Sequence, residues 1–170
     1  GTTANQMAKA HGARVIATAG TPEKVALCQE LGADIAINYR EEDFEAVVSE
    51  AGGADVILDM VGGSYVQKNI NCARAGARLV SIAFLQGSRC ELDLMRVMLK
   101  RITLTGSTLR ARPVAEKARL AAAIRETVWP WIEAGQLRPV IDSRFALADA
   151  VSAHERLDSG AHSGKILLTC

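Results

Sequence analysis

The segment Ala19–Lys24 combines residue types that could hold a phosphate group. It follows a short apolar run, Arg14–Thr18, whose composition predicts a buried strand. In a nucleotide-binding sheet, the corresponding strand usually ends in an Asp or Glu that accepts hydrogen bonds from ribose hydroxyls. Here no carboxylate stands at the strand end, while Gly20 allows close backbone approach, Thr21 offers a hydroxyl and Lys24 offers a cation. This pattern favours NADPH over NADH, but it also fits an ordinary capped helix whose lysine is simply solvated.

Three further loops follow predicted strands, at the edge where parallel sheets bind ligands. In Asp59–Ser64 the glycines bring the backbone close to whatever lies over the strand ends. We expect Asp59 to cap the turn rather than to act in catalysis. The backbone of Ala83–Gly87 and of Ser107–Arg110 could hold a nicotinamide carboxamide.

Tyr39 and the three histidines are the remaining candidates. Tyr39 could flank an adenine-ribose phosphate, or it could pack on its own helix. His11 ends a predicted helix and His154 lies on an exposed-looking one, so His162 is the only histidine that we consider near a ligand. The histidines and the four cysteines show no metal-ligand spacing, and no Ser/His/Asp set can be assembled. We therefore predict no catalytic residue and no metal ligand in this chain.

The charge balance and the apolar pattern restrict the partners. The chain has 20 basic and 19 acidic residues and a net charge of +1, so nothing points to a nucleic-acid or membrane partner. No apolar run is long enough to span a membrane, and no signal peptide is visible. The cysteines are widely spaced, which fits small buried hydrophobic residues or a free terminal thiol in a reducing, cytoplasmic environment.

Helical and strand-like segments alternate along the chain, which predicts an α/β fold with a doubly wound, parallel, Rossmann-type sheet. Pro130 is expected to kink or break the last long helix. Helices are predicted at 2–12, 22–31, 42–50, 64–74, 93–100, 113–134 and 148–157, and strands at 14–18, 34–38, 54–58, 77–83, 102–106, 139–145 and 165–169.

The first strand of such a sheet is missing from the predicted elements. Gly1 could be the last glycine of a G-x-G-x-x-G-like loop, and a helix follows it at once. We therefore expect the sequence to be part of a longer chain that is cut inside this loop. Residues 1–138 are predicted to be an incomplete nucleotide-binding domain, and residues 139–170 to pack on a catalytic domain outside this sequence.

Several separate blocks resemble one enzyme family. Gly1-Thr-Thr-Ala, Leu31-Gly-Ala-Asp and Ser163-Gly-Lys-Ile-Leu-Leu are similar to segments of the zinc-independent quinone oxidoreductase branch of the medium-chain dehydrogenase/reductase superfamily. Ile57-Leu-Asp-Met-Val-Gly-Gly-Ser-Tyr resembles, more narrowly, the p53-inducible quinone oxidoreductase subgroup. The likeness extends over essentially all 170 residues.

The resemblance implies an enzyme that uses NADPH to reduce a quinone or a similar conjugated carbonyl. It also implies an N-terminal GroES-like domain that forms most of the quinone pocket, and we expect a homodimer for the full-length protein. Zinc ligands of related enzymes lie in that other half. The implied cofactor-binding residues are Gly1, Thr2, Gly20, Thr21, Lys24, Tyr39, Val61, Gly62, Phe84, Leu109 and His162.

Other functions stay open at this point. An enoyl reductase of the same superfamily would differ mainly in the absent domain. A nucleotide-binding protein without turnover is an alternative of a different class. A methyltransferase is disfavoured because it usually has an acid at the end of the second strand, where this chain has Gly20 and Lys24.

A sheet without its central strand predicts that residues 1–170 do not fold alone. Each buried, unpaired backbone group costs about 1–3 kcal/mol, so several would exceed the roughly 5–15 kcal/mol stability of a domain. Either a gap should separate the strands at 15–18 and 54–58, or residues preceding Gly1 should form the strand between them. We expect the second outcome. Expressed alone, residues 1–170 should be unfolded, aggregated or completed by another chain. A sharp, cooperative melt of a monomeric, NADPH-binding chain would contradict this.

Overall fold

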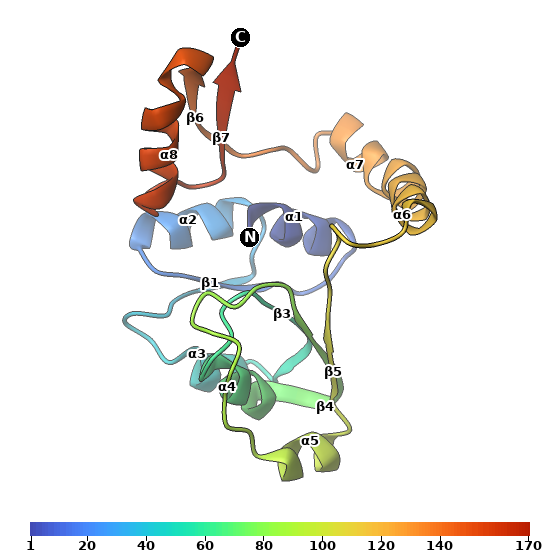
Figure 1. Cartoon of the computed structure of the whole chain (residues 1–170). Helices are drawn as coiled ribbons and strands as arrows, with labels where there is room; N and C mark the ends of the chain where they lie inside the picture. Colours follow the sequence, from blue (N-terminus) through green and yellow to red (C-terminus); the bar gives the residue numbers. More distant parts are fainter. The chain divides into compact units, whose positions relative to one another are not determined.

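Every strand pair in the computed structural model is parallel, as expected for strands joined by helical crossovers (Figure 1). The strands form three sheets with the orders β1-β2, β3-β4-β5 and β6-β7. Their bounds are β1 Ile16–Ala19, β2 Ile35–Asn38, β3 Ala54–Asp59, β4 Ala73–Ser81, β5 Thr103–Gly106, β6 Ile141–Ala146 and β7 Lys165–Thr169.

At least one α-helix separates each pair of consecutive strands, so the predicted α/β class and the parallel pairing are confirmed. The helices are α1 Thr2–Ala10, α2 Pro22–Glu30, α3 Phe44–Glu50, α4 Tyr65–Cys72, α5 Leu94–Lys100, α6 Val114–Thr127, α7 Trp129–Glu133 and α8 Ala150–Asp158, with the short 3-10 helix η1 at Leu147–Asp149.

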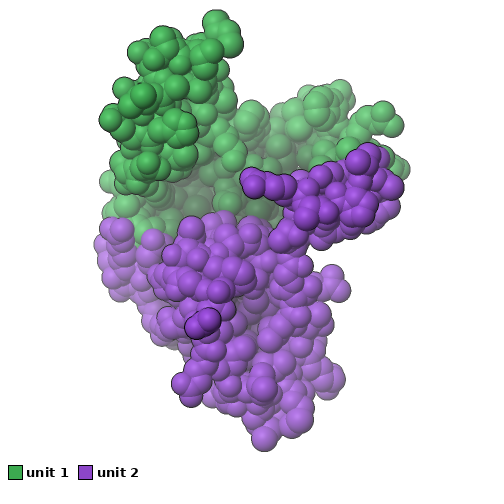
Figure 2. Space-filling view, in the orientation of Figure 1, with its two compact units in different colours: residues 1–38, 120–170 green, residues 39–119 purple.

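The structure describes all 170 residues and divides into two units (Figure 2). Unit 1 comprises Gly1–Asn38 and Leu120–Cys170, and unit 2 comprises Tyr39–Arg119. Sheet β1-β2 and sheet β6-β7 belong to unit 1, and sheet β3-β4-β5 belongs to unit 2. No helix of the structure has the length and apolar character needed to cross a membrane.

β1 pairs only with β2, and β3 pairs only with β4, so no strand of residues 1–170 pairs with both β1 and β3. Whether residues preceding Gly1 form the strand between them stays a prediction.

Two helix ends test the boundaries that the sequence predicts. The break predicted near Pro130 is confirmed, since α6 ends at Thr127 and Pro130 lies in the first turn of α7, where its missing N–H is tolerated. The helix predicted to reach residue 74 instead ends at Cys72. Ala73 has extended backbone angles, φ −71° and ψ 143°, and already pairs with Ala54 of β3.

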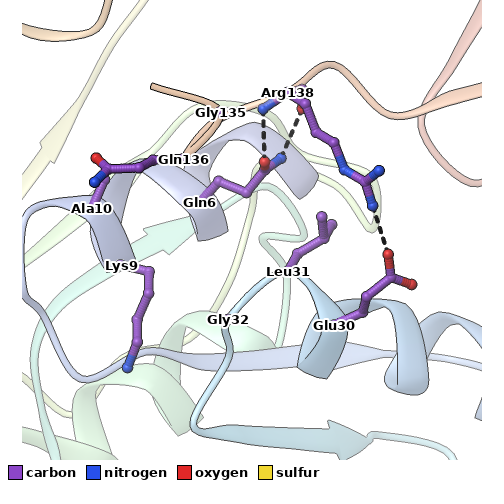
Figure 3. A pocket seen from close by; sticks show the side chains of 9 residues that line it. All are labelled: Gln6, Lys9, Ala10, Glu30, Leu31, Gly32, Gly135, Gln136 and Arg138. Atoms are coloured by element: carbon purple, nitrogen blue, oxygen red, sulfur yellow. Dashed lines mark hydrogen bonds and ion pairs between the residues drawn. The ribbon is translucent and has the colours of Figure 1, made fainter. Parts of the chain in front are cut away.

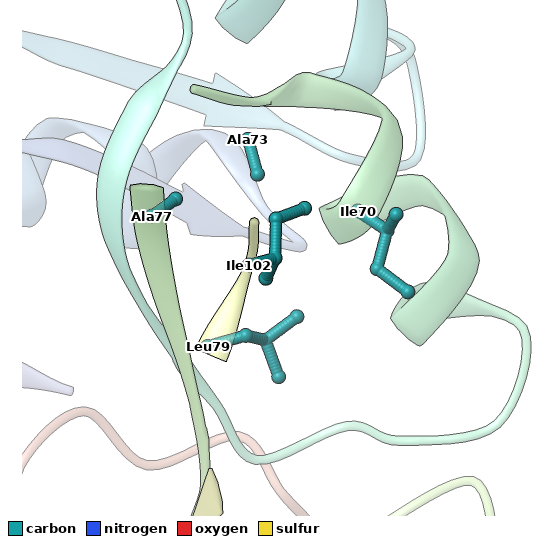
Figure 4. Packing of buried hydrophobic residues seen from close by; sticks show 5 residues of the cluster. All are labelled: Ile70, Ala73, Ala77, Leu79 and Ile102. Carbon is teal, nitrogen blue, oxygen red and sulfur yellow. The ribbon is translucent and has the colours of Figure 1, made fainter. Parts of the chain in front are cut away.

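Unit 2 is built around a small apolar core and a lysine. Ile70, Ala73, Ala77, Leu79 and Ile102 pack together, each at most 7% exposed (Figure 4). Lys100 is the last residue of α5. Its Nζ donates hydrogen bonds to three carbonyl oxygens where α4 ends and β4 begins, those of Ile70, Asn71 and Ala73, at 3.1, 2.7 and 2.8 Å. The ammonium thereby satisfies carbonyls that the helix leaves unpaired where its chain turns into β4.

Lys100→Met should destabilise the full-length protein by about 1–3 kcal/mol, because it keeps the apolar stem but leaves the carbonyls without their charged donor. Urea unfolding measures this free energy. Lys117→Met is the matched control, since exposed Lys117 contacts one carbonyl, that of Arg110 at 2.8 Å. It should change the free energy of unfolding by less than about 0.5 kcal/mol. Equal effects of the two substitutions would show that the three-carbonyl contact adds nothing.

Candidate cofactor-binding site

The turn between β1 and α2 has the geometry of a capped helix start. Thr21 has an extended backbone and is the N-cap of α2, and its Oγ1 accepts a hydrogen bond from the Lys24 N–H at 3.3 Å. Pro22 occupies the first turn. Gly20, just before the cap, is buried. The amides of this first turn are engaged within the protein: Pro22 has no N–H, the Lys24 N–H is bound to Thr21, and the Glu23 carboxylate accepts hydrogen bonds from its own N–H and from the Thr21 hydroxyl, which lower the pKa of Glu23. The positive end of the helix dipole and the Lys24 ammonium are what this turn offers to an anion.

Lys24 extends to a segment that lies far away in the sequence. Its Nζ donates a hydrogen bond to the carbonyl oxygen of Gly160 at 2.6 Å. His162, two residues further along, is half-buried, and its Nδ1 is buried without a hydrogen-bond partner. Unit 1 therefore brings Lys24 to the segment Ser159–Gly164, which contains His162, although the sequence predicted Lys24 and His162 as separate candidates.

The segment Ser159–Gly164 is held by a buried carboxylate. Asp142 of β6 has a side chain only 9% exposed. Its Oδ1 accepts hydrogen bonds from the Ser163 N–H at 2.9 Å and from Arg156 Nη2 at 3.0 Å, and its Oδ2 accepts one from Arg156 Nε at 3.1 Å. The Arg156 guanidinium, with the Ser163 amide, holds the pKa of Asp142 well below its ordinary range.

The first two cofactor candidates lie at the start of α1. Gly1 is the N-cap of this helix, and its carbonyl oxygen accepts a hydrogen bond from the Asn5 N–H at 3.1 Å. Thr2 is the first helical residue and is half-exposed. Both belong to unit 1, together with Thr21 and Lys24.

In unit 2, the loop after β3 is tightly joined to the loop after β4. Asp59, 3% exposed, accepts hydrogen bonds at Oδ1 from the N–H groups of Val61 and Gly62 at 2.8 and 3.2 Å, so its predicted capping role is confirmed. Its Oδ2 is buried and has no hydrogen-bond partner. The Gln86 N–H donates to the Val61 carbonyl at 2.8 Å, and the Gly63 N–H donates to that of Gly87 at 2.9 Å.

Gly62 allows this close approach of the two loops. It has φ +71°, and a Cβ at this position would lie 2.5 Å from the Gly87 carbonyl oxygen and 2.8 Å from a ring carbon of Phe84. Val61, Gly62 and Phe84 are thus neighbours, as expected if they line one site. Phe84 is 50% exposed and Leu109, after β5, is 59% exposed, so both present apolar surface.

Tyr39 packs against Tyr65, which belongs to an aromatic group with Phe44. Its ring meets the edge of Tyr65 with centroids 6.5 Å apart, and Tyr65 stacks on Phe44 at 5.1 Å. Burial and the neighbouring Tyr39 hydroxyl raise the pKa of Tyr65. Lys68 Nζ lies 5.7 Å from the Phe44 ring centroid and forms an ion pair with Asp43 at 2.8 Å. Tyr39 itself remains 42% exposed and can still offer a ring face or its hydroxyl.

A separate pocket of about 480 Å³ lies in unit 1 and is lined by none of these residues (Figure 3). The Gln6 side chain bridges to Arg138 there, donating to its carbonyl at 3.0 Å and accepting from its N–H at 2.9 Å, while Arg138 Nη2 pairs with Glu30 at 2.6 Å. Sequence reasoning missed this bridge, and a buried glutamine on a helix was its only local signal. The lining residues are Gln6, Lys9, Ala10, Glu30, Leu31, Gly32, Gly135, Gln136 and Arg138.

Comparison with known proteins places this arrangement in a family. The family model described as zinc-binding dehydrogenase matches residues 1–126. The chain belongs to this family. Quinone oxidoreductase from Homo sapiens is 30% identical over 174 residues, which cover 99% of this chain and 50% of the relative. A 2-haloacrylate reductase from Burkholderia sp is 28% identical, covering 92% of this chain and 48% of the relative. The chain thus spans about half the length of the curated relatives it matches.

Solved structures agree with this placement. The quinone oxidoreductase of Thermus thermophilus, described together with its NADPH complex, superposes with a TM-score of 0.87 at 30% identity, covering 100% of this chain and 54% of the other. An NAD-dependent alcohol dehydrogenase superposes with a TM-score of 0.83 at 31% identity, covering 99% of this chain and 47% of the other. The Rossmann-type fold and the resemblance to quinone oxidoreductases are therefore confirmed. The narrower likeness to the p53-inducible subgroup stays a prediction.

The metal in the family's description has no matching donor set in this chain. No three His, Cys, Asp or Glu side chains come together in a way that could hold a metal ion. Cys72 is buried, Cys28 is half-buried, and Cys90 and Cys170 are exposed, so the expectation of small buried thiols is wrong for Cys90. The side chains of residues 1–170 therefore do not form a metal centre by themselves.

The paired Asp142 predicts a stability that declines in acid. Its native pKa is depressed, so its contribution is present above the ordinary carboxyl pKa and is lost progressively as the pH falls below about 4. The difference in unfolding free energy between wild type and Asp142→Asn should be largest near pH 7 and shrink towards pH 2. Urea unfolding across this range measures it. Asp55→Asn, which removes an ion pair with both side chains more than half exposed, should show almost no difference at any pH.

Proposed function

We propose that this chain is the cofactor-binding part of an NADPH-dependent quinone oxidoreductase. The observation that carries the proposal is the end of β1, which has no carboxylate and is followed by Thr21 and Lys24 at the start of α2. The carboxylate of Glu23, in the first turn of α2, is bound to Thr21 and to its own backbone N–H. An acid at the end of β1 would repel a 2′-phosphate, whereas a helix start and an ammonium attract one. The Thermus thermophilus relative with an NADPH complex supports the same cofactor.

The residues present fit a dinucleotide in one further respect. His162 Nδ1 is a buried polar atom without a partner, and it lies in the segment whose Gly160 carbonyl Lys24 contacts. We assign Gly20, Thr21, Lys24, Tyr39 and His162 to the adenosine and its 2′-phosphate. The set assigned to the rest of the cofactor is Gly1, Thr2, Val61, Gly62, Phe84 and Leu109.

In the proposed mechanism the residues of this chain bind and orient the cofactor, and none of them acts as a general acid. When bound, the nicotinamide supplies a hydride to the acceptor. Lys24 and the positive end of the α2 dipole hold the phosphate end by charge. The exposed apolar side chains of Phe84 and Leu109 exclude water from the nicotinamide end. Residues 1–138 would carry the cofactor, and residues 139–170 would pack on the domain that forms the quinone pocket.

A second candidate is a reductase of activated carbon–carbon double bonds. The Burkholderia relative named 2-haloacrylate reductase favours it. Its cofactor site would be the same, so a panel of quinones and conjugated acids or enones assayed with the full-length protein separates the two. Tight NADPH binding with no turnover of any acceptor would instead indicate a nucleotide-binding protein without catalysis.

Lys24→Ala should weaken NADPH binding to the full-length protein by about 1–3 kcal/mol, the range for a lost charge-assisted contact. NADH binding should change little, because NADH has no 2′-phosphate. Fluorescence titration of both cofactors provides the dissociation constants. Lys9→Ala is the control, since Lys9 lies in the last turn of α1 and pairs with Asp34. Equal losses for NADPH and NADH would show that Lys24 does not read the phosphate.

A further inference from the structure

The Lys24 ammonium contacts the segment Ser159–Gly164, which forms neither a helix nor a strand. Lys24 is a flexible side chain on a helix surface, and its one described side-chain contact is the Gly160 carbonyl at 2.6 Å. The position of its charge therefore depends on where the backbone of Ser159–Gly164 lies. The residues that bind this segment thus also set the position of the ammonium.

Contacts fix the segment at both ends. At its start, Ser159 Oγ donates to the Arg156 carbonyl at 2.7 Å and accepts from the Ala161 N–H at 3.3 Å. At its end, the Lys165 N–H donates to the Val140 carbonyl at 2.8 Å. Gly164 lies close to Val140, the residue just before β6, and a Cβ on Gly164 would be 2.3 Å from the Val140 carbonyl oxygen.

Asp142 joins the middle of the segment to α8. Its carboxylate accepts two hydrogen bonds from Arg156 and one from the Ser163 N–H. Because the carboxylate is charged and its side chain is only 9% exposed, solvent competes little for these three bonds, and they fix Ser163, three residues from the carbonyl that Lys24 uses. In Figure 1, β6 and α8, which carry Asp142 and Arg156, lie with β7 at the C-terminal end of the chain.

We propose that Asp142 is a positioning residue for cofactor specificity, acting through Ser159–Gly164 to place the Lys24 ammonium where it reads the 2′-phosphate. The inference rests on the proposed function. Asp142 does not touch the cofactor in this scheme. Removing its charge releases both Arg156 and the Ser163 amide, so the Gly160 carbonyl and the ammonium lose their fixed position.

Asp142→Asn in the full-length protein should raise the dissociation constant of NADPH about tenfold, the size of one lost charge-assisted hydrogen bond. The dissociation constant of NADH should stay within about twofold, since no phosphate is read. Asp55→Asn, which also removes a carboxylate paired with an arginine but on the surface of unit 2, should leave both constants unchanged. Equal weakening of NADPH and NADH by Asp142→Asn would overturn the inference.

A double-mutant cycle with Lys24→Ala separates positioning from a general loss of structure. If Asp142 acts through Lys24, Asp142→Asn should cost almost nothing further in NADPH binding once Lys24 is alanine. An equal cost in both backgrounds would contradict the inference. Should Asp142→Asn not fold, Arg156→Lys keeps the cation but gives up the two-point contact, and it should shift NADPH in the same direction by a smaller factor. No shift with Arg156→Lys would also contradict the inference.

Cofactor binding by the wild-type protein separates a failure of the proposed NADPH dependence from a failure of the role assigned to Asp142. If wild-type protein binds NADPH no better than NADH, the proposed function fails and the inference fails with it. If wild-type protein prefers NADPH and Asp142→Asn keeps the full preference, only the role of Asp142 is wrong.

Discussion

Parallel strand pairing is the constraint on which the rest of this structure depends. Because each strand pair runs in the same direction, every chain segment that leaves a strand does so at the same edge of its sheet. The turn after β1 and the loops after β3 and β4 are built at such edges, and they carry most of the candidate site. The unit 1 edge offers a helix start and Lys24, and the unit 2 edge offers glycines and backbone groups. A site of this kind suits a bound cofactor that brings its own chemistry.

Each unit stabilises its edge by a different device. In unit 2 the buried Asp59 carboxylate caps the loop after β3, and Gly62 lets the loop after β4 approach within hydrogen-bond distance. In unit 1 the charge of Asp142 holds a segment that in turn holds Lys24. In both units a carboxylate with little exposure to solvent fixes the backbone of a loop.

The sequence predicts well what a few neighbouring residues determine. Thr21 and Pro22 define the start of α2, Pro130 breaks a helix and Asp59 caps its turn, and all of these follow from local geometry. The Lys24 contact with Gly160 spans 136 residues, and the Lys100 contacts with the end of α4 span 27–30, so no local pattern reveals them. The early start of β4 at Ala73 was missed for the same reason, since pairing with β3 overrides the helical pattern.

The most direct test of the account is a crystal structure of the full-length protein with bound NADPH. The account predicts the 2′-phosphate at the start of α2, within hydrogen-bond distance of Lys24 Nζ and next to Thr21, with Ser163 still bound to Asp142. A 2′-phosphate bound elsewhere, with Lys24 remaining only on the Gly160 carbonyl, would contradict it.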